Sequence, residues 1–407
     1  MLMDDQTPDR ANNARSAMKG SNQSGLRDHN ERLVLTMIQS HGAMPGVDIA
    51  RQTGLSQQTV SVILRSLESD HLVVRGDPVR GKVGKPSVPV SLNPDGAFSV
   101  GVKIGRRSAD VVLIDILGNV RHQWHLNYRY PMPDPILMFL KGSLAKMPEH
   151  IGAVGVARIA GIGVAMPGEI WNWHDTIGAP PADLDRWRDL DFCAAIAEFS
   201  DLPVQVGNDA TAACRAENIY GRGREFSNYA YFFMGLFIGG GVVLNHSVFE
   251  GPKGNAGAFG PLLSFDETGK RSQLLDSASL HVLEADLVRA GVDPLRLWTQ
   301  PQDWSDFDNL VSVWIERTAA HLAQAALTAC AVIDFEAVLI DGGFPADVRD
   351  RLVASMREKI VKLDQRGLIM PRIEAGSVGG NARGLGAATG PIFSRYFLNT
   401  HGAFAAV

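Results

Sequence analysis

The feature that most restricts the fold of this 407-residue chain is a pair of short helical segments joined by a glycine turn near the N-terminus. Ala50 lies in the first segment, Gly54 follows four residues later in the turn, and Val60 lies six residues further on in the second segment. A small side chain lets two helices approach closely, and glycine readily adopts the positive φ that a tight turn needs. This spacing predicts a helix-turn-helix, with an ordinary helical hairpin as the alternative interpretation.

The second helical segment presents hydrogen-bonding side chains on the face opposite its apolar residues. Ser56 precedes it and is a suitable N-cap, because its hydroxyl can accept a hydrogen bond from a backbone N–H of the first turn. Polar side chains of this kind read base edges and phosphates in the major groove of DNA. The residues expected to contact DNA on this helix are Ser56, Gln57, Gln58, Thr59, Ser61 and Arg65.

Two predicted strands, 72–75 and 88–92, follow this helix and are joined by a glycine-containing loop. The loop carries Arg80, Lys82 and Lys85. A basic hairpin loop directly after a helix-turn-helix is expected to act as a wing that lies along the phosphate backbone or in the minor groove. A solvated charged loop is the alternative for the same residues.

Charge and composition change along the chain. Residues 29–92 carry seven Lys and Arg against five Asp and Glu, a formal charge of +2, whereas the whole chain has a net charge of −5. Residues 1–27 are rich in Asn, Ser, Asp and Gln and poor in large apolar side chains, so a disordered tail is expected there. We therefore expect a DNA-binding domain at 28–93 and a larger domain at 94–407.

The larger domain is expected to have an α/β fold, because short apolar runs alternate with longer helical patterns. Strands are predicted at 98–104, 109–115, 159–165, 203–206, 229–234, 239–245 and 337–341. Helices are predicted at 135–147, 190–200, 209–220, 273–290, 307–331 and 345–360.

Composition argues against several classes of protein. Hydrophobic residues make up 45% of the chain and charged residues 20%, as in ordinary globular proteins. There is no apolar run long enough for a membrane span and no secretory signal at the polar N-terminus, so a cytoplasmic location is expected. The three cysteines, Cys193, Cys214 and Cys330, are widely spaced, which supports neither a disulfide framework nor a cysteine-rich zinc site.

The order of motifs along the chain resembles the ROK family of repressors and sugar kinases. After the helix-turn-helix and paired strands come an Asn-Asp-Ala motif at 208–210, a glycine-rich hairpin at 235–241 and an Asn-Ala-Gly segment at 255–257. The resemblance covers nearly everything from residue 28 to the C-terminus. It implies a two-lobed, actin-like ATPase fold with the ligand cleft between a small lobe at about 94–208 and a large lobe at about 209–385.

The same resemblance assigns roles to residues of the cleft. In the kinases of the family, the residue that matches Asp209 is the general base for the sugar hydroxyl, and the one that matches Asn208 binds the sugar. Capping of the following helix is a plainer role for the same two residues. The ligand-binding residues expected from the resemblance are Pro167, Gly168, Asn208, Asp209, Asn255 and Asp276.

Both phosphate-binding loops of the kinases are altered in this chain. Lys103 stands where the kinases have an aspartate for Mg²⁺, and an ammonium group cannot bind that ion. Leu236 and Phe237 stand where the family usually has a threonine and a further glycine. The arginines that follow Lys103, Arg106 and Arg107, are predicted to form a solvated turn, with anion binding as the alternative. We therefore expect no kinase activity, with any base role of Asp209 vestigial.

The sugar and zinc segment also departs from the family pattern. Ala258 stands in place of the sugar-binding glutamate, and Pro261 in place of the zinc-linked histidine. Residues 262–273 contain no cysteine. Because the thiolate and imidazole ligands are missing, no metal of the family type and no cofactor is expected.

These patterns favour a sequence-specific transcriptional regulator, a repressor of sugar metabolism or transport genes, whose degenerate kinase cleft senses a sugar or sugar derivative. Its expected partners are an inverted-repeat operator in double-stranded DNA and a second copy of the chain, as a homodimer or tetramer, with no membrane partner. Two alternatives remain open. One is an active ATP-dependent sugar kinase, and the other is a ligand-independent repressor whose larger domain is only a scaffold.

Overall fold

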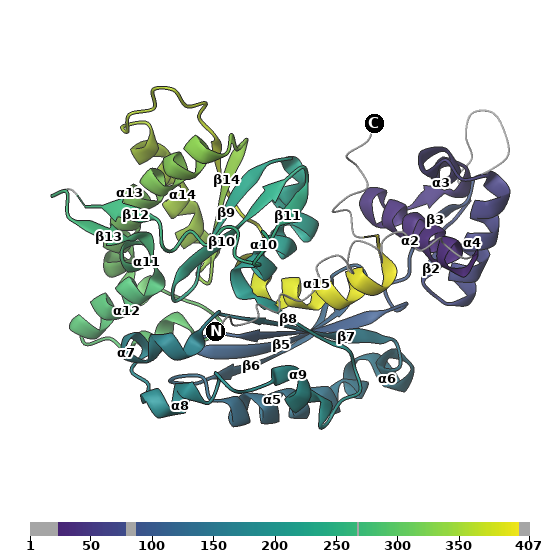
Figure 1. The fold of residues 1–407 in the computed structure, drawn as a ribbon, viewed down its shortest axis with the longest axis horizontal. Helices are drawn as coiled ribbons and strands as arrows, with labels where there is room; N and C mark the ends of the chain where they lie inside the picture. Colours follow the sequence, from purple (N-terminus) through teal and green to yellow (C-terminus); the bar gives the residue numbers. More distant parts are fainter. Residues whose placement is uncertain (1–22, 79–86, 267, 399–407) are drawn as a thin grey trace, which may run out of the picture. The chain divides into compact units, whose positions relative to one another are not determined.

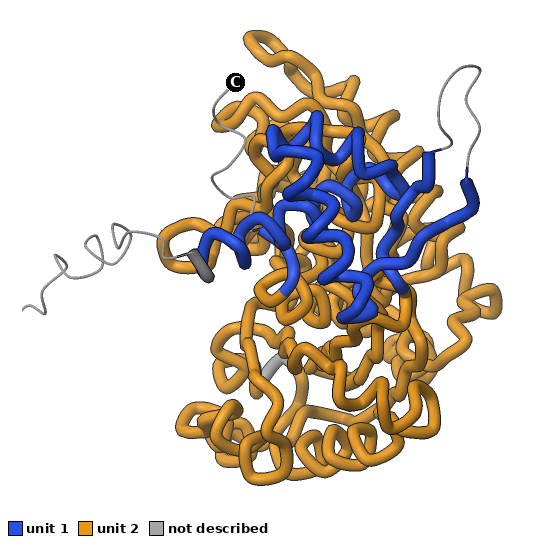
Figure 2. Tube along the Cα trace, turned by 90° about the vertical axis from the view of Figure 1, so that its right-hand side faces the viewer, with its two compact units in different colours: residues 1–93, 396–398 blue, residues 94–395, 399–407 orange. Residues whose placement is uncertain are grey.

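The computed structural model describes residues 23–78, 87–266 and 268–398. These residues form two compact units, one containing residues up to 93 together with 396–398, and the other containing residues 94–395 (Figure 2). The predicted wing residues Arg80, Lys82 and Lys85 lie outside the described residues. Within the described residues, none of the helices has both the length and the apolar character needed to cross a bilayer.

The first unit has three helices and one small antiparallel sheet. The helices are α2 (Gln23–His41), α3 (Gly46–Thr53) and α4 (Gln57–Ser69), and the sheet has the order β1 (Met44–Pro45), β3 (Pro89–Leu92), β2 (Val73–Arg75). Helix α2 begins at Gln23, five residues before the expected start of the domain. Its first turns are held by Arg27, whose guanidinium donates to Glu31 at 3.0 Å and to Ser66 of α4 at 3.1 Å.

The turn between α3 and α4 has the geometry that the sequence predicted. Gly54 ends α3 with a φ of 71°, in the left-handed region. Ser56 caps α4, because its hydroxyl accepts from the Thr59 N–H at 3.1 Å. The apolar face of α4 is buried through Val60 and Leu67, among others. The helix-turn-helix is therefore held by a glycine turn, a hydroxyl cap and an apolar core, as expected from its spacing.

The end of the chain contributes to the same unit. Phe397 is 1% exposed, and the Leu398 N–H donates to Thr36 Oγ1 on α2 at 3.0 Å. Residues 396–398 therefore group with the helix-turn-helix, although the sequence placed them in the larger domain.

The second unit contains two five-stranded sheets of the same topology (Figure 1). The first has the order β6 (Val120–Asn127), β5 (Ser108–Asp115), β4 (Phe98–Ile104), β7 (Ile159–Met166), β8 (Val204–Asn208). The second has the order β11 (Ser247–Phe249), β10 (Ile238–Leu244), β9 (Tyr229–Met234), β14 (Ala337–Gly342), β15 (Arg372–Ala375). In each sheet three antiparallel strands are followed by two parallel ones. These two mixed sheets are the lobes of an actin-like ATPase fold.

Two helices made largely of small residues lie between the sheets, α10 (Asp209–Tyr220) and α15 (Ala382–Tyr396) (Figure 1). A Cβ added to Gly163 of β7 would overlap the carbonyl group of Ala387 on α15. A Cβ added to Gly386 of α15 would overlap the carbonyl group of Ala212 on α10. Glycine at these positions lets backbone approach backbone, which brings both helix N-termini close to the space between the lobes.

Other helices cover the outer faces of the sheets. The remaining α-helices are α5 (Pro133–Lys146), α6 (Pro148–Val156), α7 (His174–Ile177), α8 (Pro181–Asp185), α9 (Phe192–Ala197), α11 (Leu274–Ser277), α12 (Leu280–Arg289), α13 (Asp308–Val332) and α14 (Ala346–Ile360). A two-stranded hairpin, β12 (Leu263–Phe265) and β13 (Arg271–Gln273), completes the unit. Short 3₁₀ turns lie at Ile170–Trp173, Arg222–Glu225, Pro294–Leu297, Ser305–Phe307 and Gly379–Asn381.

One predicted helix, 273–290, is divided into α11 and α12 around Ser279. The Ser279 hydroxyl donates to the Leu275 carbonyl at 2.6 Å and accepts from the Ile238 N–H at 2.8 Å. A side chain that bonds to the backbone competes with the helical ladder, so the helix is interrupted where Ser279 ties it to β10.

Candidate functional site

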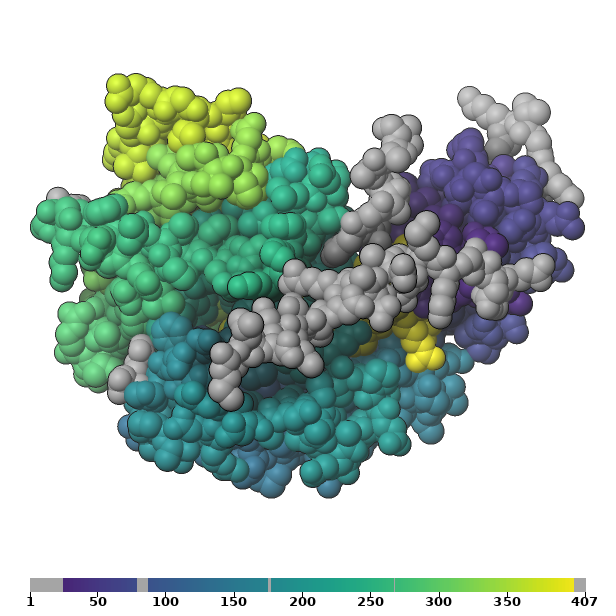
Figure 3. All heavy atoms as spheres, viewed as in Figure 1, coloured from purple at the N-terminus to yellow at the C-terminus, as the bar shows by residue number. Residues whose placement is uncertain are grey.

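The second unit contains a cavity of about 920 Å³ between its two sheets. Its walls are the β4–β5 turn, the ends of β7 and β8, the β9–β10 turn, the segment around residues 253–261 and the first turn of α15. Figure 3 shows the two lobes of the unit one above the other, the lower one blue to teal and the upper one green to yellow. The ends of strands from both sheets therefore meet around one space, as expected for a ligand cleft.

Five of the six predicted ligand residues line this cavity: Pro167, Gly168, Asn208, Asp209 and Asn255. Asp276 does not line it. Its side chain is exposed on the short helix α11, whose neighbouring residue Leu275 faces the cavity while Leu274 is buried. The register of that segment therefore turns the Asp276 carboxylate to solvent.

Asn208 and Asp209 begin helix α10 at the cavity wall. Asn208 Oδ1 accepts hydrogen bonds from the backbone N–H groups of Ala210 at 2.9 Å and Thr211 at 3.1 Å, so the asparagine caps the helix. The Asp209 side chain is 15% exposed and forms an ion pair of 3.4 Å with Arg383 of α15. Asp209 therefore lies at a helix N-terminus and is paired with a cation of the neighbouring helix.

Lys103 of β4 lines the cavity but does not present a free ammonium group to it. Its Nζ donates to the Ser108 carbonyl at 3.0 Å and hydroxyl at 2.6 Å, and pairs with Asp110 at 3.1 Å. His125 Nδ1 lies 2.5 Å from the same carboxylate. All three N–H donors of the ammonium group therefore bind residues of β5, and these contacts hold the β4–β5 turn together.

Burial dominates the electrostatics of this group. Burial lowers the pKa of Lys103 to about 8, against the attraction of Asp110. Burial alone would raise the pKa of Asp110, but Lys103 and His125 together hold it far below its ordinary value. The charge pair joins the neighbouring strands β4 and β5 and is internal to one sheet.

The prediction of a solvated turn at Arg106 and Arg107 is wrong. The Arg106 guanidinium lies against the rings of Trp173, at 4.8 Å, and Phe237, at 4.5 Å, and its buried Nε has no hydrogen-bond partner among the described residues. Arg107 forms two hydrogen bonds of 3.2 Å to the carboxylate of Glu284. Both arginines are held inside the protein by aromatic and acidic partners that lie far away in the sequence. A local sequence pattern does not reveal such partners.

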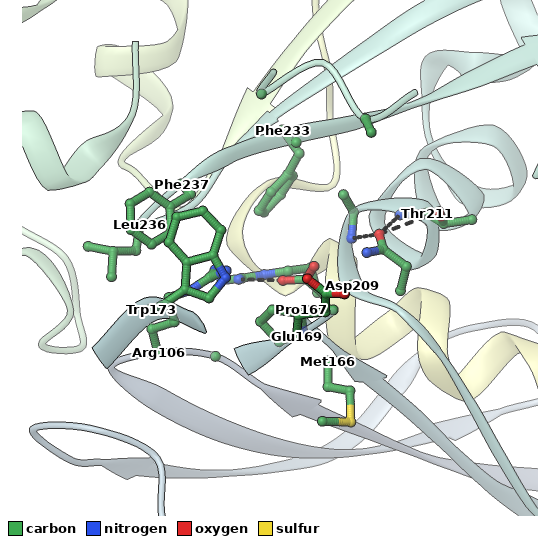
Figure 4. A pocket seen from close by; sticks show the side chains of 18 of the residues that line it. Arg106, Met166, Pro167, Glu169, Trp173, Asp209, Thr211, Phe233, Leu236 and Phe237 are labelled. Atoms are coloured by element: carbon green, nitrogen blue, oxygen red, sulfur yellow. Dashed lines mark hydrogen bonds and ion pairs between the residues drawn. The ribbon is translucent and has the colours of Figure 1, made fainter. Parts of the chain in front are cut away.

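The second altered phosphate loop supplies one of those partners. Leu236 and Phe237 are 5% and 8% exposed, and the Phe237 ring lies 4.4 Å from Trp173 (Figure 4). Arg106 lies against both rings. This cluster of one cation and two aromatic rings occupies space beside the β4–β5 and β9–β10 turns. By the family resemblance, these are the turns expected to correspond to the phosphate loops of the kinases.

Arg383 is a residue of the cavity that the sequence reasoning missed. It is 8% exposed, its guanidinium lies 5.0 Å from the Phe233 ring, and its buried Nε has no partner among the described residues. The one signal was an arginine in a stretch of small residues at 376–386. Its approach to Asp209, across 174 positions of sequence, follows only from the packing of α15 against α10.

The β12–β13 hairpin, which follows the Asn255–Gly257 segment, is anchored by hydrogen bonds. Ser264 Oγ lies 2.6 Å from His321 Nδ1, and the Gln324 amide bonds both backbone groups of Phe265 at 3.2 and 3.0 Å. The β12–β13 hairpin is thereby fastened to α13. Among the residues that the structure describes, no group of three or more His, Cys, Asp or Glu side chains is arranged to hold a metal ion.

Helix α4 of the first unit is the candidate DNA-contact surface. Beyond the cap residue Ser56, four of the predicted residues have exposed side chains: Gln57, Gln58, Ser61 and Arg65. Ser56 is exposed at the cap, and Thr59 is half-buried, with its hydroxyl 2.8 Å from that of Ser56. The capping role of these two hydroxyls orients the first turn, so the four exposed side chains are the ones free to reach a groove.

Two family profiles match the chain. The profile of the ROK family matches residues 99–389, and a profile of winged helix-turn-helix DNA-binding domains matches residues 27–74. The first match covers well over half of the chain, and the two together follow the division into units.

Similar proteins include known regulators. The xylose repressor of Bacillus subtilis (strain 168) is 25% identical over 244 residues, which are 59% of this chain and 62% of that repressor. The DNA-binding transcriptional dual regulator NagC of Escherichia coli (strain K12) is 21% identical over 336 residues, 78% of this chain and 81% of that protein. The crystal structure of a ROK family transcriptional regulator, homologous to the E. coli MLC protein, has a TM-score of 0.64 at 19% identity, covering 91% of this chain and 98% of that one.

Proposed function

This chain belongs to the ROK family and is a DNA-binding transcriptional regulator of that family, and from this premise we propose that it represses genes of sugar metabolism or transport in response to a small-molecule ligand. The ligand binds in the cavity of the second unit, and the operator is an inverted repeat bound by two copies of the chain. A two-fold symmetric dimer matches the symmetry of such a site.

The observation that carries this proposal is the exposed polar face of α4 on a chain whose second unit contains a large cavity. Gln58 and Arg65 offer the amide and guanidinium groups that recognise adenine and guanine edges. Helix α4 is rigidly held by its cap and core, so these groups are presented in a fixed orientation. The cavity retains polyol-binding groups at Asn208 and Asp209.

Kinase activity is not part of the proposal, because the cavity has no group at Lys103 that could hold Mg²⁺ and Phe237 crowds the second loop. Phosphoryl transfer depends on placing and neutralising the transferred phosphate, which both loops must do together. We expect no sugar-dependent ATP turnover on a panel of hexoses and pentoses. Turnover that Asp209→Ala abolishes would contradict this part and favour the kinase alternative.

A ligand changes operator affinity only if it binds one state of the protein more tightly than another. In the proposed mechanism, a ligand between the two sheets changes their separation, and the dimer then holds its DNA-binding units at a different spacing. The scaffold alternative predicts instead that no small molecule stabilises the second unit. A thermal denaturation screen against sugars and sugar derivatives separates the two, since a ligand at a hundred times its Kd adds about 2.7 kcal/mol.

The DNA-binding part is tested by incubating the protein with fragmented genomic DNA at near-physiological salt and sequencing the retained fragments. We expect a few inverted-repeat sites close to sugar uptake or catabolic genes. Gln58→Ala should relax the sequence preference at one or two base pairs by about 1–3 kcal/mol, whereas Ser69→Ala, exposed at the far end of the same helix, should not. Uniform retention that vanishes with added salt would contradict sequence-specific recognition.

A further inference from the structure

The cavity wall is strongly cationic for a site expected to take a neutral sugar. Six lysine and arginine residues line it against two acidic ones. The basic residues are Lys103, Arg106, Arg107, Arg188, Lys253 and Arg383, and the acidic ones are Glu169 and Asp209. Three of the basic groups are paired with acids outside the lining: Lys103 with Asp110, Arg107 with Glu284, and Arg188 with Asp185 at 3.4 Å. Arg106, Lys253 and Arg383 remain in the wall against Glu169 and Asp209, so positive charge exceeds negative charge there.

The imbalance is concentrated around Asp209. Arg383 forms its ion pair with this carboxylate, and Arg106 is attracted by the same carboxylate and repelled by Arg383. Burial lowers the pKa of Arg106 to about 10, and the proximity of Arg383 acts in the same direction. One carboxylate therefore faces two buried guanidinium groups.

Both guanidinium groups also have donors that the protein does not use. The Nε atoms of Arg106 and Arg383 are buried without a hydrogen-bond partner among the described residues. A buried, charged donor left unpaired costs on the order of 1–3 kcal/mol, and more when the group is ionised. Both arginines line the cavity, so their positive charge is incompletely matched by acceptors of the protein at this wall.

The surroundings of Arg106 hold the group in place for this purpose. Trp173 and Phe237 lie against its guanidinium, with their ring centroids 4.4 Å apart and an interplanar angle of 32° (Figure 4). Stacked rings fix the plane of a guanidinium while leaving its edge open to hydrogen bonding. Planar, fixed guanidinium groups are suited to bind carboxylate or phosphate oxygens in pairs.

From this wall we propose that the ligand of the cleft is an anionic sugar, whose acidic group binds Arg106 and Arg383 while its hydroxyl groups bind Asn208 and Asp209. This inference rests on the proposed ligand-sensing function and names the class of its ligand. The shared chemistry is an oxyanion on a polyol, which a sugar acid supplies as a carboxylate and a sugar phosphate supplies as a phosphate. Asp209 and Glu169 are the two acidic residues among those that line the cavity, so few carboxylates would repel an anionic ligand there.

The test is calorimetric titration of the full chain with matched neutral and acidic sugars: glucose, glucuronate, gluconate and glucose 6-phosphate, and galactose with galacturonate. Inorganic phosphate alone is the probe for an unspecific anion site. We expect at least one acidic sugar to bind tenfold or more tightly than its neutral partner and than inorganic phosphate. The carboxylate and phosphate probes tell the two sources of the oxyanion apart.

Arg106→Gln tests the geometry, because it removes the charge and keeps a polar side chain beside the two rings. Loss of a charge-assisted hydrogen bond should weaken the acidic sugar about ten- to a hundredfold and leave the neutral one nearly unchanged. Arg106→Lys should restore only part of the affinity, because a lysine lacks the planar fork. Arg366→Gln, at a side chain 91% exposed and outside the cavity wall, is the matched control and should bind as the parent does.

Each outcome separates this inference from the proposed function. Neutral sugars that bind as tightly as acidic ones, or an Arg106→Gln variant that binds the acidic sugar like the parent, would overturn the anionic ligand and leave ligand sensing intact. Equal affinity for inorganic phosphate would also overturn it. The absence of binding by every probe would overturn both this inference and ligand sensing, while operator retention would still test DNA recognition independently.

Discussion

Replacing Lys103 by methionine should destabilise the second unit mainly through the partner it leaves behind. The ammonium is paired with Asp110 at 3.1 Å, and the two side chains are 6% and 15% exposed. Removing one member of a buried pair costs about 3–5 kcal/mol, because the other charge stays buried without its partner. Asp110 keeps its contact with His125, so the lower end, about 3 kcal/mol, is expected at pH 7.

The double variant Lys103→Met with Asp110→Asn should recover most of that loss. With both charges removed, the cost of burying them disappears together with their attraction, so the double variant should fall within about 1–2 kcal/mol of the parent. The remaining cost comes from the Ser108 groups, which lose the ammonium donor. A double variant as unstable as the sum of the two single ones would refute the coupling of this pair.

The pH dependence gives a second check on the same reasoning. In the parent, the pKa of Asp110 is held well below its ordinary value, so the pair stabilises the fold above about pH 4 and this contribution is lost only at lower pH. In Lys103→Met the carboxyl is free to take a proton, so the difference in stability from the parent should shrink between pH 7 and pH 4.

Urea denaturation followed by tryptophan fluorescence suits this measurement. All seven tryptophans lie within residues 94–395, so the signal reports the second unit selectively. The midpoint should move with the cost of each variant, while the slope of the transition should stay the same because the same surface is exposed on unfolding. A gap between Lys103→Met and the parent that is constant from pH 7 to pH 4 would contradict the assignment to Asp110.

Three further predictions concern other parts of the chain. Asn208→Ala removes the cap of α10 and should cost about 1 kcal/mol by urea titration, with a further loss of ligand affinity, whereas Asn208→Asp should keep the cap. Phe397→Ala empties a buried site in the first unit and should cost about 3–5 kcal/mol there, seen as faster proteolysis of residues 23–93 and weaker operator binding; unchanged proteolysis would contradict its place in that core. Burial lowers the pKa of His321, so the stability that the neutral imidazole contributes is full above the ordinary histidine pKa and is lost as the pH falls below it. His321→Gln should therefore reduce the loss of stability in acid, and an unchanged pH profile of stability would exclude this role of His321.

Much of the fold follows from local patterns that the sequence displays directly. The glycine turn at Gly54 and the cap at Ser56 are local devices, and both have the predicted geometry. Helix α10 begins and ends where the pattern places it, at 209 and 220, because an N-cap asparagine and a following glycine mark its ends. The interruption at Ser279 was not visible, since it depends on a hydrogen bond to a strand that lies 41 residues away.

Only those residues of the cavity that belong to recognisable sequence motifs were predicted. The ends of β7 and β8 carry Pro167 and Asp209 to the site as the family resemblance implies. The cationic wall was not predicted, because Arg106 is ordered by Trp173 and Phe237, and Arg383 by the packing of α15. A charged residue in a turn or among small residues looks solvated until the distant partners are known.

The most direct test of the regulator is the affinity of the full chain for a recovered operator, measured by fluorescence anisotropy as an acidic sugar is added at constant ionic strength. The account predicts that the operator Kd changes by at least fivefold as the ligand saturates, that Arg106→Gln shifts this response to higher ligand concentration, and that Arg366→Gln does not. An operator Kd that stays constant while calorimetry shows the cleft to be occupied would contradict the claim that the cavity regulates DNA binding.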